Sequence, residues 1–273
     1  MPTGRDAASL HKSEPTTVDP ADVHKSRPEN VWISDMRQET AHTLSAAFSI
    51  PPAPGRPRFV ELMEVQRQAG MLQLHRQLEV SRDDVLVLDR IGLRFIVDGV
   101  AGKDAVRRGV VRSHRVAAPD RRTRRTSRQR FGVEIARGLV ALGRSQVRVL
   151  PRPLYLRLRS RADDLQAGSG DAAPTGFTPL TIAATDRLAS DHLSDHVTAM
   201  QLAAALEASI AGARPDSLVT SLKLAFHTYT EPATQPLVRW SDRGDRIDGE
   251  VSQGGLLRAH FSARVEASDR REP

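Results

Sequence analysis

Residues 58–97 read RFVELMEVQRQAGMLQLHRQLEVSRDDVLVLDRIGLRFIV, and the hydrophobic period changes within this stretch. Up to residue 78, apolar side chains recur at near-helical spacing, with charged and amide side chains between them. This pattern predicts a helix over 58–78. Residues 85–97 follow a polar break and are rich in Val, Leu and Ile, which predicts strand structure. The stretch therefore predicts one long helix that leads into a β-sheet.

The rest of the chain repeats this order of elements. In the first half, further strand candidates lie at 31–34, 43–50, 131–142, 145–150 and 154–159, with a hairpin turn expected at Gly143-Arg144. In the second half, a helix predicted at 197–212 precedes strand candidates at 217–229, 235–241, 246–252 and 255–266. Helices and strands do not alternate as a parallel sheet would require. We therefore predict an α+β fold in which each half wraps an antiparallel sheet around one helix.

Composition shifts divide the chain into two repeats with short flanking segments. The expected parts are a disordered tail at 1–22, a first repeat at 23–160 with an Arg-rich loop at 103–130, a linker at 161–183, a second repeat at 184–267 and a tail at 268–273. The linker is rich in Gly, Ala and Asp, a composition typical of flexible connections.

Bulk composition excludes several kinds of chemistry. The 273 residues include no Cys, which excludes disulfides, thiolate zinc sites and a cysteine nucleophile. No apolar run is long enough to cross a bilayer, and the N-terminus has no signal-like apolar segment. We therefore expect a cytoplasmic protein with no membrane partner.

The net charge of +7 is concentrated in the segment 107–130, which is dense in Arg. Such a segment can bind nucleic acid or an anionic carrier protein, or it can be a solvated loop. No aromatic residue interrupts it before Phe131, so a platform for base stacking is missing. No helix-turn-helix or zinc-finger pattern surrounds it. We do not expect nucleic acid as a partner.

Two acid–histidine pairs, Asp191-His192 and Asp195-His196, stand just before the second predicted helix. A neighbouring carboxylate can orient an imidazole and raise its basicity. The helix N-terminus adds free N–H groups that can polarise a carbonyl, so the segment could support acyl chemistry. The alternative is that one Asp caps the helix and both histidines are solvated. No further ligand cluster supports a metal site, and we expect no cofactor.

Three segments of the chain resemble the motifs of one family. They are Val23-His24-Lys25-Ser26-Arg27-Pro28-Glu29-Asn30-Val31, then Glu64-Val65-Gln66-Arg67-Gln68-Ala69-Gly70, then Asp191-His192-Leu193-Ser194-Asp195-His196-Val197. Their order and spacing are similar to those of the A-factor biosynthesis (AfsA-like) hotdog proteins, which serve γ-butyrolactone signalling in actinobacteria. The sequence departs from the family pattern at Leu193, where Pro is usual, and at Thr198-Ala199, where Pro-Gly is usual.

The resemblance implies a double hotdog fold and an acyltransferase activity. Members of the family join a β-ketoacyl group, carried on acyl carrier protein, to the hydroxyl of dihydroxyacetone phosphate. The fold is shared with thioester dehydratases, whose site combines a His from one hotdog with a helix carboxylate from the other. The partners expected here are therefore an acyl carrier protein thioester and dihydroxyacetone phosphate.

The two repeats differ in complementary ways. The first keeps Glu64 and Arg67 on its helix but has no His in the pre-helix segment 48–52, whereas the second carries Ala204 and Glu207 at the matching positions. One complete site can therefore form across the repeats. Its expected residues are Glu64, His192, His196, Asp191 and Asp195 for catalysis, with Arg67 and Gln68 for substrate binding. Taken alone, Glu64 and Arg67 could instead be a surface ion pair one helical turn apart.

Two other functions remain open at this point. A non-catalytic or regulatory hotdog protein would use the basic segment to bind a carrier protein or nucleic acid. A thioester hydratase or dehydratase on the same scaffold would need no Arg for a phosphate.

Overall fold

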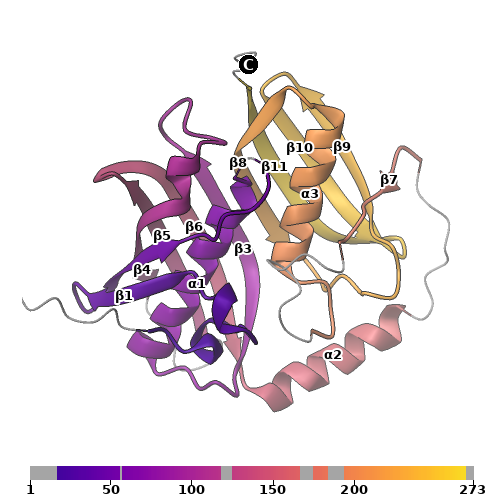
Figure 1. The fold of residues 1–273 in the computed structure, drawn as a ribbon. Helices are drawn as coiled ribbons and strands as arrows, with labels where there is room; N and C mark the ends of the chain where they lie inside the picture. The colour runs from indigo at the N-terminus through magenta and orange to yellow at the C-terminus, as the bar shows by residue number, and fades with distance from the viewer. Residues whose placement is uncertain (1–16, 56, 118–124, 167–174, 184–193, 269–273) are drawn as a thin grey trace, which may run out of the picture.

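The residues that the structure describes form one eleven-stranded antiparallel sheet and three α-helices (Figure 1). This computed structural model describes residues 17–55, 57–117, 125–166, 175–183 and 194–268. The strand order is β1-β2-β4-β5-β6-β3-β8-β11-β10-β9-β7. The α+β class expected from the sequence is therefore confirmed.

The bounds of the elements follow the chain in two blocks. The first block comprises η1 (Pro20–Val23), η2 (Pro28–Asn30), β1 (Ile33–Gln38), β2 (Thr43–Ser49), α1 (Phe59–Leu78), β3 (Val85–Phe95), η3 (Asp104–Arg107), β4 (Arg108–Ala117), β5 (Arg125–Ile135) and β6 (Gly138–Leu150). The second comprises α2 (Arg152–Gln166), β7 (Thr178–Pro179), α3 (Ala199–Ala213), β8 (Ser217–Phe226), β9 (Leu237–Arg243), β10 (Arg246–Gln253) and β11 (Leu256–Ala267).

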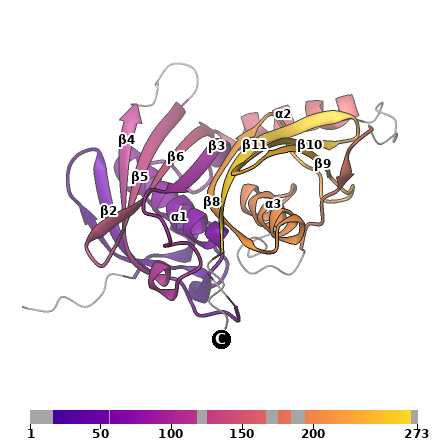
Figure 2. The ribbon, with the colours of Figure 1, turned by 90° about the horizontal axis from the view of Figure 1, so that it is seen from above.

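The two blocks meet where β3 pairs with β8. This pairing runs from Arg90 opposite Ala225 to Arg94 opposite Ser221 and makes one continuous sheet. Seen from above, the sheet curls around α1 on one side of this seam and around α3 on the other (Figure 2). Both helices lie on the same face of the sheet, and the first turn of α1 packs against the middle of α3.

Helix α1 is buried on nearly all sides although it carries several polar side chains. Hydrogen bonds to the sheet satisfy part of these groups, while the Gln66 amide oxygen has no partner among the described residues. The amide of Gln66 donates to the Arg144 carbonyl at 3.0 Å, and Gln129 donates to the Gly70 carbonyl at 2.9 Å. Gly143 allows the close approach, because a Cβ there would lie 2.2 Å from the Gln66 amide oxygen.

A carboxylate of α3 binds the first turn of α1. The Glu207 oxygens accept hydrogen bonds from the backbone N–H groups of Phe59 at 2.6 Å and Val60 at 3.0 Å. These two N–H groups have no acceptor within their own helix, and the helix dipole favours a negative group at this end. Burial raises the pKa of the Glu207 carboxyl above its ordinary value. The contact fixes the two helices relative to each other.

The predicted strand at 154–159 is wrong, since these residues belong to α2. The alternation of Leu and Arg has the period of a strand, yet Pro153 favours a helical first turn. In the helix, Tyr155 and Arg159 lie one turn apart on the buried face, while Leu154, Leu156 and Leu158 stay partly exposed. Tertiary contacts of that face override the local pattern.

The turn expected at Gly143-Arg144 is also wrong. The chain reverses at Ala136-Arg137, where both residues have positive φ, between β5 and β6. Gly143 lies inside β6, where the Gln66 side chain requires a residue without Cβ. The Arg-rich loop expected at 103–130 is largely β4 and β5, with residues 118–124 outside the described part.

Two expected boundaries differ from the structure. Residues 17–22 of the predicted tail are placed, and the Asp22 carboxylate binds Arg82 at 2.6 Å and Arg76 at 3.1 Å. The predicted linker at 161–183 includes the end of α2 and the short strand β7, which pairs with β9. Among the described helices, none combines the length and apolar character that a membrane span needs.

Replacing Glu207 by Leu should lower the free energy of unfolding by about 2–4 kcal/mol, because two buried N–H groups lose their acceptor. Glu207→Gln keeps one acceptor oxygen and should lose less. Urea denaturation measures both. Glu29→Leu, at an exposed position, is the control and should change stability by less than about 0.5 kcal/mol. Equal losses of unfolding free energy in the residue 207 and residue 29 variants would contradict the role of Glu207 as a cap of α1.

Candidate functional site

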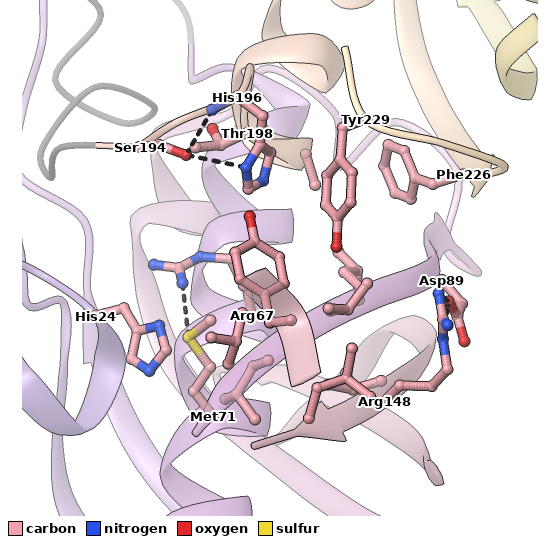
Figure 3. A pocket seen from close by; sticks show the side chains of 18 of the residues that line it. His24, Arg67, Met71, Asp89, Arg148, Ser194, His196, Thr198, Phe226 and Tyr229 are labelled. Atoms are coloured by element: carbon pink, nitrogen blue, oxygen red, sulfur yellow. Dashed lines mark hydrogen bonds and ion pairs between the residues drawn. The ribbon is translucent and has the colours of Figure 1, made fainter. Parts of the chain in front are cut away.

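A cavity of about 720 Å³ lies between the two blocks of the fold. It is bounded by α1, β3, β6, α2, the segment that leads into α3, and the end of β8. Ligand pockets for small molecules commonly have this volume. Arg67 of α1 and His196 of the segment before α3 face the same space (Figure 3).

Asp195 and His196 form an ion-pair-like dyad at this cavity. The Nδ1 atom of His196 lies 2.6 Å from an Asp195 carboxylate oxygen, and its ring packs against Tyr229 at 4.8 Å between centroids. A carboxylate at Nδ1 favours the tautomer with the proton on that nitrogen. The Nε2 atom is then a proton acceptor, which is the state that a general base requires.

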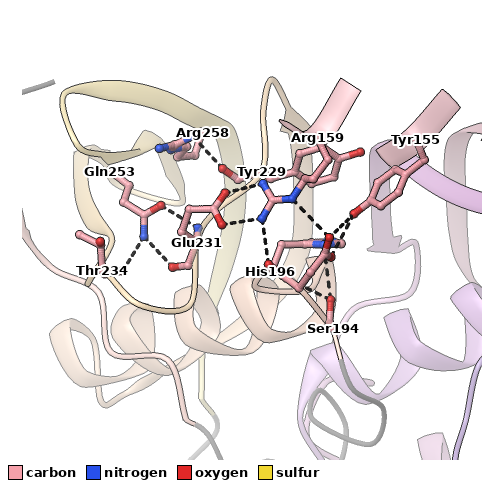
Figure 4. Close-up of polar contacts among 10 residues, drawn as sticks. Tyr155, Arg159, Ser194, His196, Tyr229, Glu231, Thr234, Gln253 and Arg258 are labelled. Carbon is pink, nitrogen blue, oxygen red and sulfur yellow. Dashed lines mark hydrogen bonds and ion pairs between the residues drawn. The ribbon is translucent and has the colours of Figure 1, made fainter. Parts of the chain in front are cut away.

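Helix α2 holds the Asp195 carboxylate. The Tyr155 hydroxyl donates to it at 2.8 Å, and Arg159 Nε donates at 3.3 Å (Figure 4). Arg159 also binds the Asp195 carbonyl at 2.9 Å and the Glu231 carboxylate at 2.5–2.6 Å. Its guanidinium lies over the Tyr229 ring, 4.9 Å from the centroid. Asp195 is therefore positioned from a separate element.

These contacts determine the charge of Asp195. Partial burial acts to raise the pKa of its carboxyl, but hydrogen bonds from His196 and Tyr155 and the charge of Arg159 hold the pKa below its ordinary value. Burial and the bond to Asp195 raise the pKa of the Tyr155 hydroxyl, which stays a donor. An ionised Asp195 is the acceptor that the His196 Nδ1–H group needs.

Asp195 does not cap α3, so that alternative reading is excluded for this residue. The cap is Thr198, whose hydroxyl accepts from the Gln201 N–H at 3.2 Å, while Gln201 accepts from the Thr198 N–H at 2.7 Å. Ala199 and Met200, the first residues of α3, line the cavity. Their N–H groups have no acceptor within the helix. Asp191 and His192 lie outside the described residues.

Glu64 is fully buried and does not belong to the cavity lining. Its oxygens bind Arg67 through two contacts of 2.7 Å, Lys25 at 3.1 Å and the Gln68 amide at 2.9 Å. Burial acts to raise the pKa of the Glu64 carboxyl, but Arg67 and Lys25 outweigh it and hold the pKa below its ordinary value. Glu64 is thus neither a surface ion pair nor a ready proton acceptor.

Two of the motifs seen in the sequence bind each other. Besides the pair of Lys25 with Glu64, Arg67 donates to the Val23 carbonyl at 3.1 Å. Gln68 donates to the Asn30 carbonyl and accepts from the Trp32 N–H, both at 2.9 Å. The helix motif therefore anchors the N-terminal segment against α1.

Arg67 lines the cavity but has little capacity left for a ligand. A guanidinium has five N–H donors, and four hydrogen bonds to Glu64, Met71 and Val23 occupy it. A bidentate contact with a phosphate would break at least one of these. Arg152, at the start of α2, also lines the cavity, is exposed, and has no ion pair with any described residue.

Sequence reasoning missed Tyr155, Arg159 and Arg152. Their spacing of i, i+3 and i+7 would have placed them on one face of a helix. The alternation of Leu and Arg in the same segment indicated a strand instead. Within the described part of the chain, no group of three or more His, Asp and Glu residues is arranged to hold a metal ion.

The matching junction at the other end of the helices is nearly filled. There, next to Glu207 and Phe59, the space amounts to about 20 Å³. The cavity beside His196 is therefore far larger than the space beside Glu207.

Comparison with solved structures places the fold among α+β hotdog proteins. The 12:0-ACP thioesterase from Umbellularia californica is 11% identical, with a TM-score of 0.56, over 85% of this chain and 100% of the thioesterase. An acyl-ACP thioesterase from Bacteroides thetaiotaomicron is 12% identical, with a TM-score of 0.53, over 82% and 98%. HtdX of Mycobacterium tuberculosis is 12% identical, with a TM-score of 0.51, over 93% and 98%. At such identities the likeness concerns the fold alone.

The chain belongs to the AfsA family, whose model, described as the A-factor biosynthesis hotdog domain, matches residues 7–152. This confirms the family indicated by the sequence motifs. The matched range includes the first two motifs and ends before Asp191. No curated protein matches the chain.

Replacing Glu64 by Gln should lower the free energy of unfolding by about 3–5 kcal/mol near neutral pH, because Arg67 and Lys25 would be buried without an anion. The Glu64 pKa is lowered from 4.5 in the folded state. Its stabilising contribution is therefore present above that value and lost as the pH falls through the lowered folded-state pKa. The difference between wild type and variant should shrink in acid, as measured by urea unfolding. Unchanged stability with lost activity would instead indicate a catalytic Glu64.

Proposed function

We propose that this protein transfers a β-ketoacyl group from the thioester of an acyl carrier protein to the hydroxyl of dihydroxyacetone phosphate. The observation that carries the proposal is the Asp195–His196 dyad at the rim of a large cavity. Membership of the A-factor biosynthesis family supports it. The thioesterases of similar fold are named for acyl-ACP substrates, which agrees with a thioester donor here.

The site consists of the junction of two hotdog repeats. The β1–β6 part of the sheet with α1 forms the first repeat, and β7–β11 with α3 forms the second. The first supplies Arg67 and the apolar wall, and the second supplies the dyad and a helix N-terminus. This arrangement accounts for a site that needs residues from both halves of one chain.

The reaction begins when His196 Nε2 takes the proton from the attacking hydroxyl. The hydroxyl oxygen adds to the thioester carbonyl, and the N–H groups of Ala199 and Met200 stabilise the negative charge on the carbonyl oxygen. The C–S bond then breaks, and the carrier thiolate leaves with the proton from His196. The products are the ester and the free carrier thiol. Asp195, ionised throughout, stabilises the imidazolium.

The cavity wall suits an acyl chain along one side. Leu74 of α1, Leu86 and Leu88 of β3, and Val147 of β6 line it together. Burying a methylene against such a surface contributes about 0.8 kcal/mol. The acyl chain therefore lies against β3 and β6, which leaves the acceptor phosphate to the polar side near α2.

Glu64, Arg67 and Gln68 hold the cavity wall in place. Glu64 compensates the charges of Arg67 and Lys25, and Gln68 binds the N-terminal segment. Arg67 contributes positive charge to the cavity while staying bound to Glu64. Asp191 and His192 stay a prediction as further catalytic residues.

Replacing His196 by Ala should lower kcat for ester formation by about 100-fold to 10,000-fold, because the general base is removed. Mass spectrometry of reactions containing a β-ketoacyl carrier protein and dihydroxyacetone phosphate measures the product. His42→Ala is the control, since His42 is exposed and does not line the cavity. If the free β-keto acid is released at the same rate with and without dihydroxyacetone phosphate, the activity is thioester hydrolysis and not acyl transfer.

Replacing Arg152 by Gln should raise KM for dihydroxyacetone phosphate by about tenfold while kcat at saturation changes little, because a charge-assisted contact to the phosphate is lost. Arg157→Gln removes the same charge from an exposed position of α2 that does not line the cavity, and it should leave KM unchanged. Equal effects of the two substitutions would mean that Arg152 acts only through the overall charge.

A further inference from the structure

The face of the sheet opposite the helices carries a cluster of cations. We call the exposed side chains of Arg90, Arg94, Arg128, Arg130, Arg144 and Lys223 the basic sheet face. They come from β3, β5, β6 and β8, the strands at the centre of the sheet (Figure 1). Their chain neighbours on the inner face, such as Ile91, Leu93 and Phe131, are buried.

The pairing register brings these charges together. Arg130 is directly opposite Arg144, Arg144 is opposite Gly92, and Gly92 is opposite Lys223. Neighbouring strands are about 4.8 Å apart, and like charges directly opposite each other are destabilising. Gly92 lets Lys223 lie toward Arg144, because a Cβ at residue 92 would lie 2.9 Å from Lys223 Cγ.

None of these six cations has an ion pair with a described residue. Two exposed arginines of β9 and β10, near the edge of the same sheet, differ in this respect. On β9 and β10, Arg239 binds Glu250 at 2.6 Å and Arg246 binds Asp248 at 2.7 Å. The chain thus pairs these two exposed arginines of β9 and β10 but leaves the six cations without an ion pair among the described residues. A partner with negative charge would relieve the repulsion.

Apolar side chains on the same face indicate the class of partner. Leu139 and Leu142, from β6, are 42% and 37% exposed beside Arg130 and Arg144. A phosphate backbone offers no apolar surface, and no Phe, Tyr or Trp of these four strands is on this face to stack a base. Apolar contacts surrounded by charges are typical of a protein interface. The surface therefore fits an acidic protein.

The basic sheet face continues to the rim of the cavity. Arg128 donates to Gln146 at 3.3 Å, Gln146 donates to Asp89 at 3.4 Å, and Asp89 binds Arg148 at 2.7 Å. Asp89 and Arg148 both line the cavity, as Figure 3 shows. A protein seated on the cations is thus next to the space in which its thioester would react.

We propose that the basic sheet face docks an acidic protein and that this protein is the acyl carrier. Its acidic character follows from the uncompensated cations, whereas its identity as the carrier rests on the function proposed above. The carboxylates of the carrier pair with the six cations, and an apolar part of its surface covers Leu139 and Leu142.

The test is the binding of a holo acyl carrier protein to the full chain, measured by isothermal titration calorimetry at low and at physiological salt. The variant Arg130→Gln/Arg144→Gln/Lys223→Gln should bind about tenfold more weakly, with a smaller salt dependence. The matched control Arg239→Gln/Arg243→Gln/Arg246→Gln removes three exposed cations from β9 and β10 and should bind as wild type does.

Three results would overturn the docking surface. They are failure of the wild type to bind the carrier, equal weakening in both triple variants, and tighter binding of a DNA duplex that is lost in the first variant. Melting curves check that the variants are folded. Should the first variant not fold, the single changes Arg144→Gln and Lys223→Gln should each weaken carrier binding about twofold.

This outcome is distinguishable from failure of the proposed reaction. Carrier binding that depends on the basic sheet face, without any ester product, would retain the docking surface and remove the acyl transfer. If the first triple variant forms the ester with an unchanged KM for the carrier, the acyl transfer is retained and the docking surface is removed.

Discussion

The contact of Glu207 with the backbone of Phe59 and Val60 fixes one helix on the other. Glu207 lies in the middle of α3 and binds the free N–H groups at the N-terminal end of α1. The two helices therefore cannot slide along each other without leaving these buried polar groups unpaired. The pairing of β3 with β8 fixes the same two units through the sheet. The helix contact and the strand pairing together fix the volume of the cavity beside the start of α3. The walls of this cavity come from elements far apart in the chain. The cavity is therefore a consequence of how the halves are joined.

Two carboxylates near this cavity have lowered pKa values for different reasons. Glu64 is surrounded by Arg67, Lys25 and Gln68, which bind it through short, buried contacts. Asp195 binds His196, and an imidazole is the side chain best suited to general acid–base catalysis. The first carboxylate therefore holds structure together, and the second can support proton transfer by its neighbour. Both carboxylates are ionised, so their charge does not distinguish them. The role of each carboxylate is decided by the side chain that it binds.

The sequence predicted elements well where local pattern and tertiary environment agree, as in α1 and β3. It failed at α2, because the alternation of Leu and Arg has a period of two while the contacts of Tyr155 and Arg159 with Asp195 select a helix. It placed Asp195 beside His196 correctly, since adjacent residues need no fold to meet. It could not show that Glu64 binds Lys25, because that pairing depends on how a segment about forty residues earlier crosses α1. Arg152 was missed for the same reason as α2.

The spaces at the two ends of the contact between α1 and α3 differ greatly in volume, and one pair of side chains suggests why. On the repeat relationship proposed above, Arg67 of α1 and Glu207 of α3 occupy equivalent positions. Glu207 carries the charge that a helix N-terminus attracts, so it binds the free N–H groups of α1 directly, and only about 20 Å³ is left beside it. Arg67 carries the opposite charge, is held by Glu64, and cannot accept from the N–H groups at the start of α3. Those groups therefore face the large cavity, where a carbonyl oxygen that gains negative charge is the kind of ligand they favour. Under the proposed repeat relationship and reaction, one difference in charge at matching helix positions separates a structural cap from the pocket in which the thioester would react.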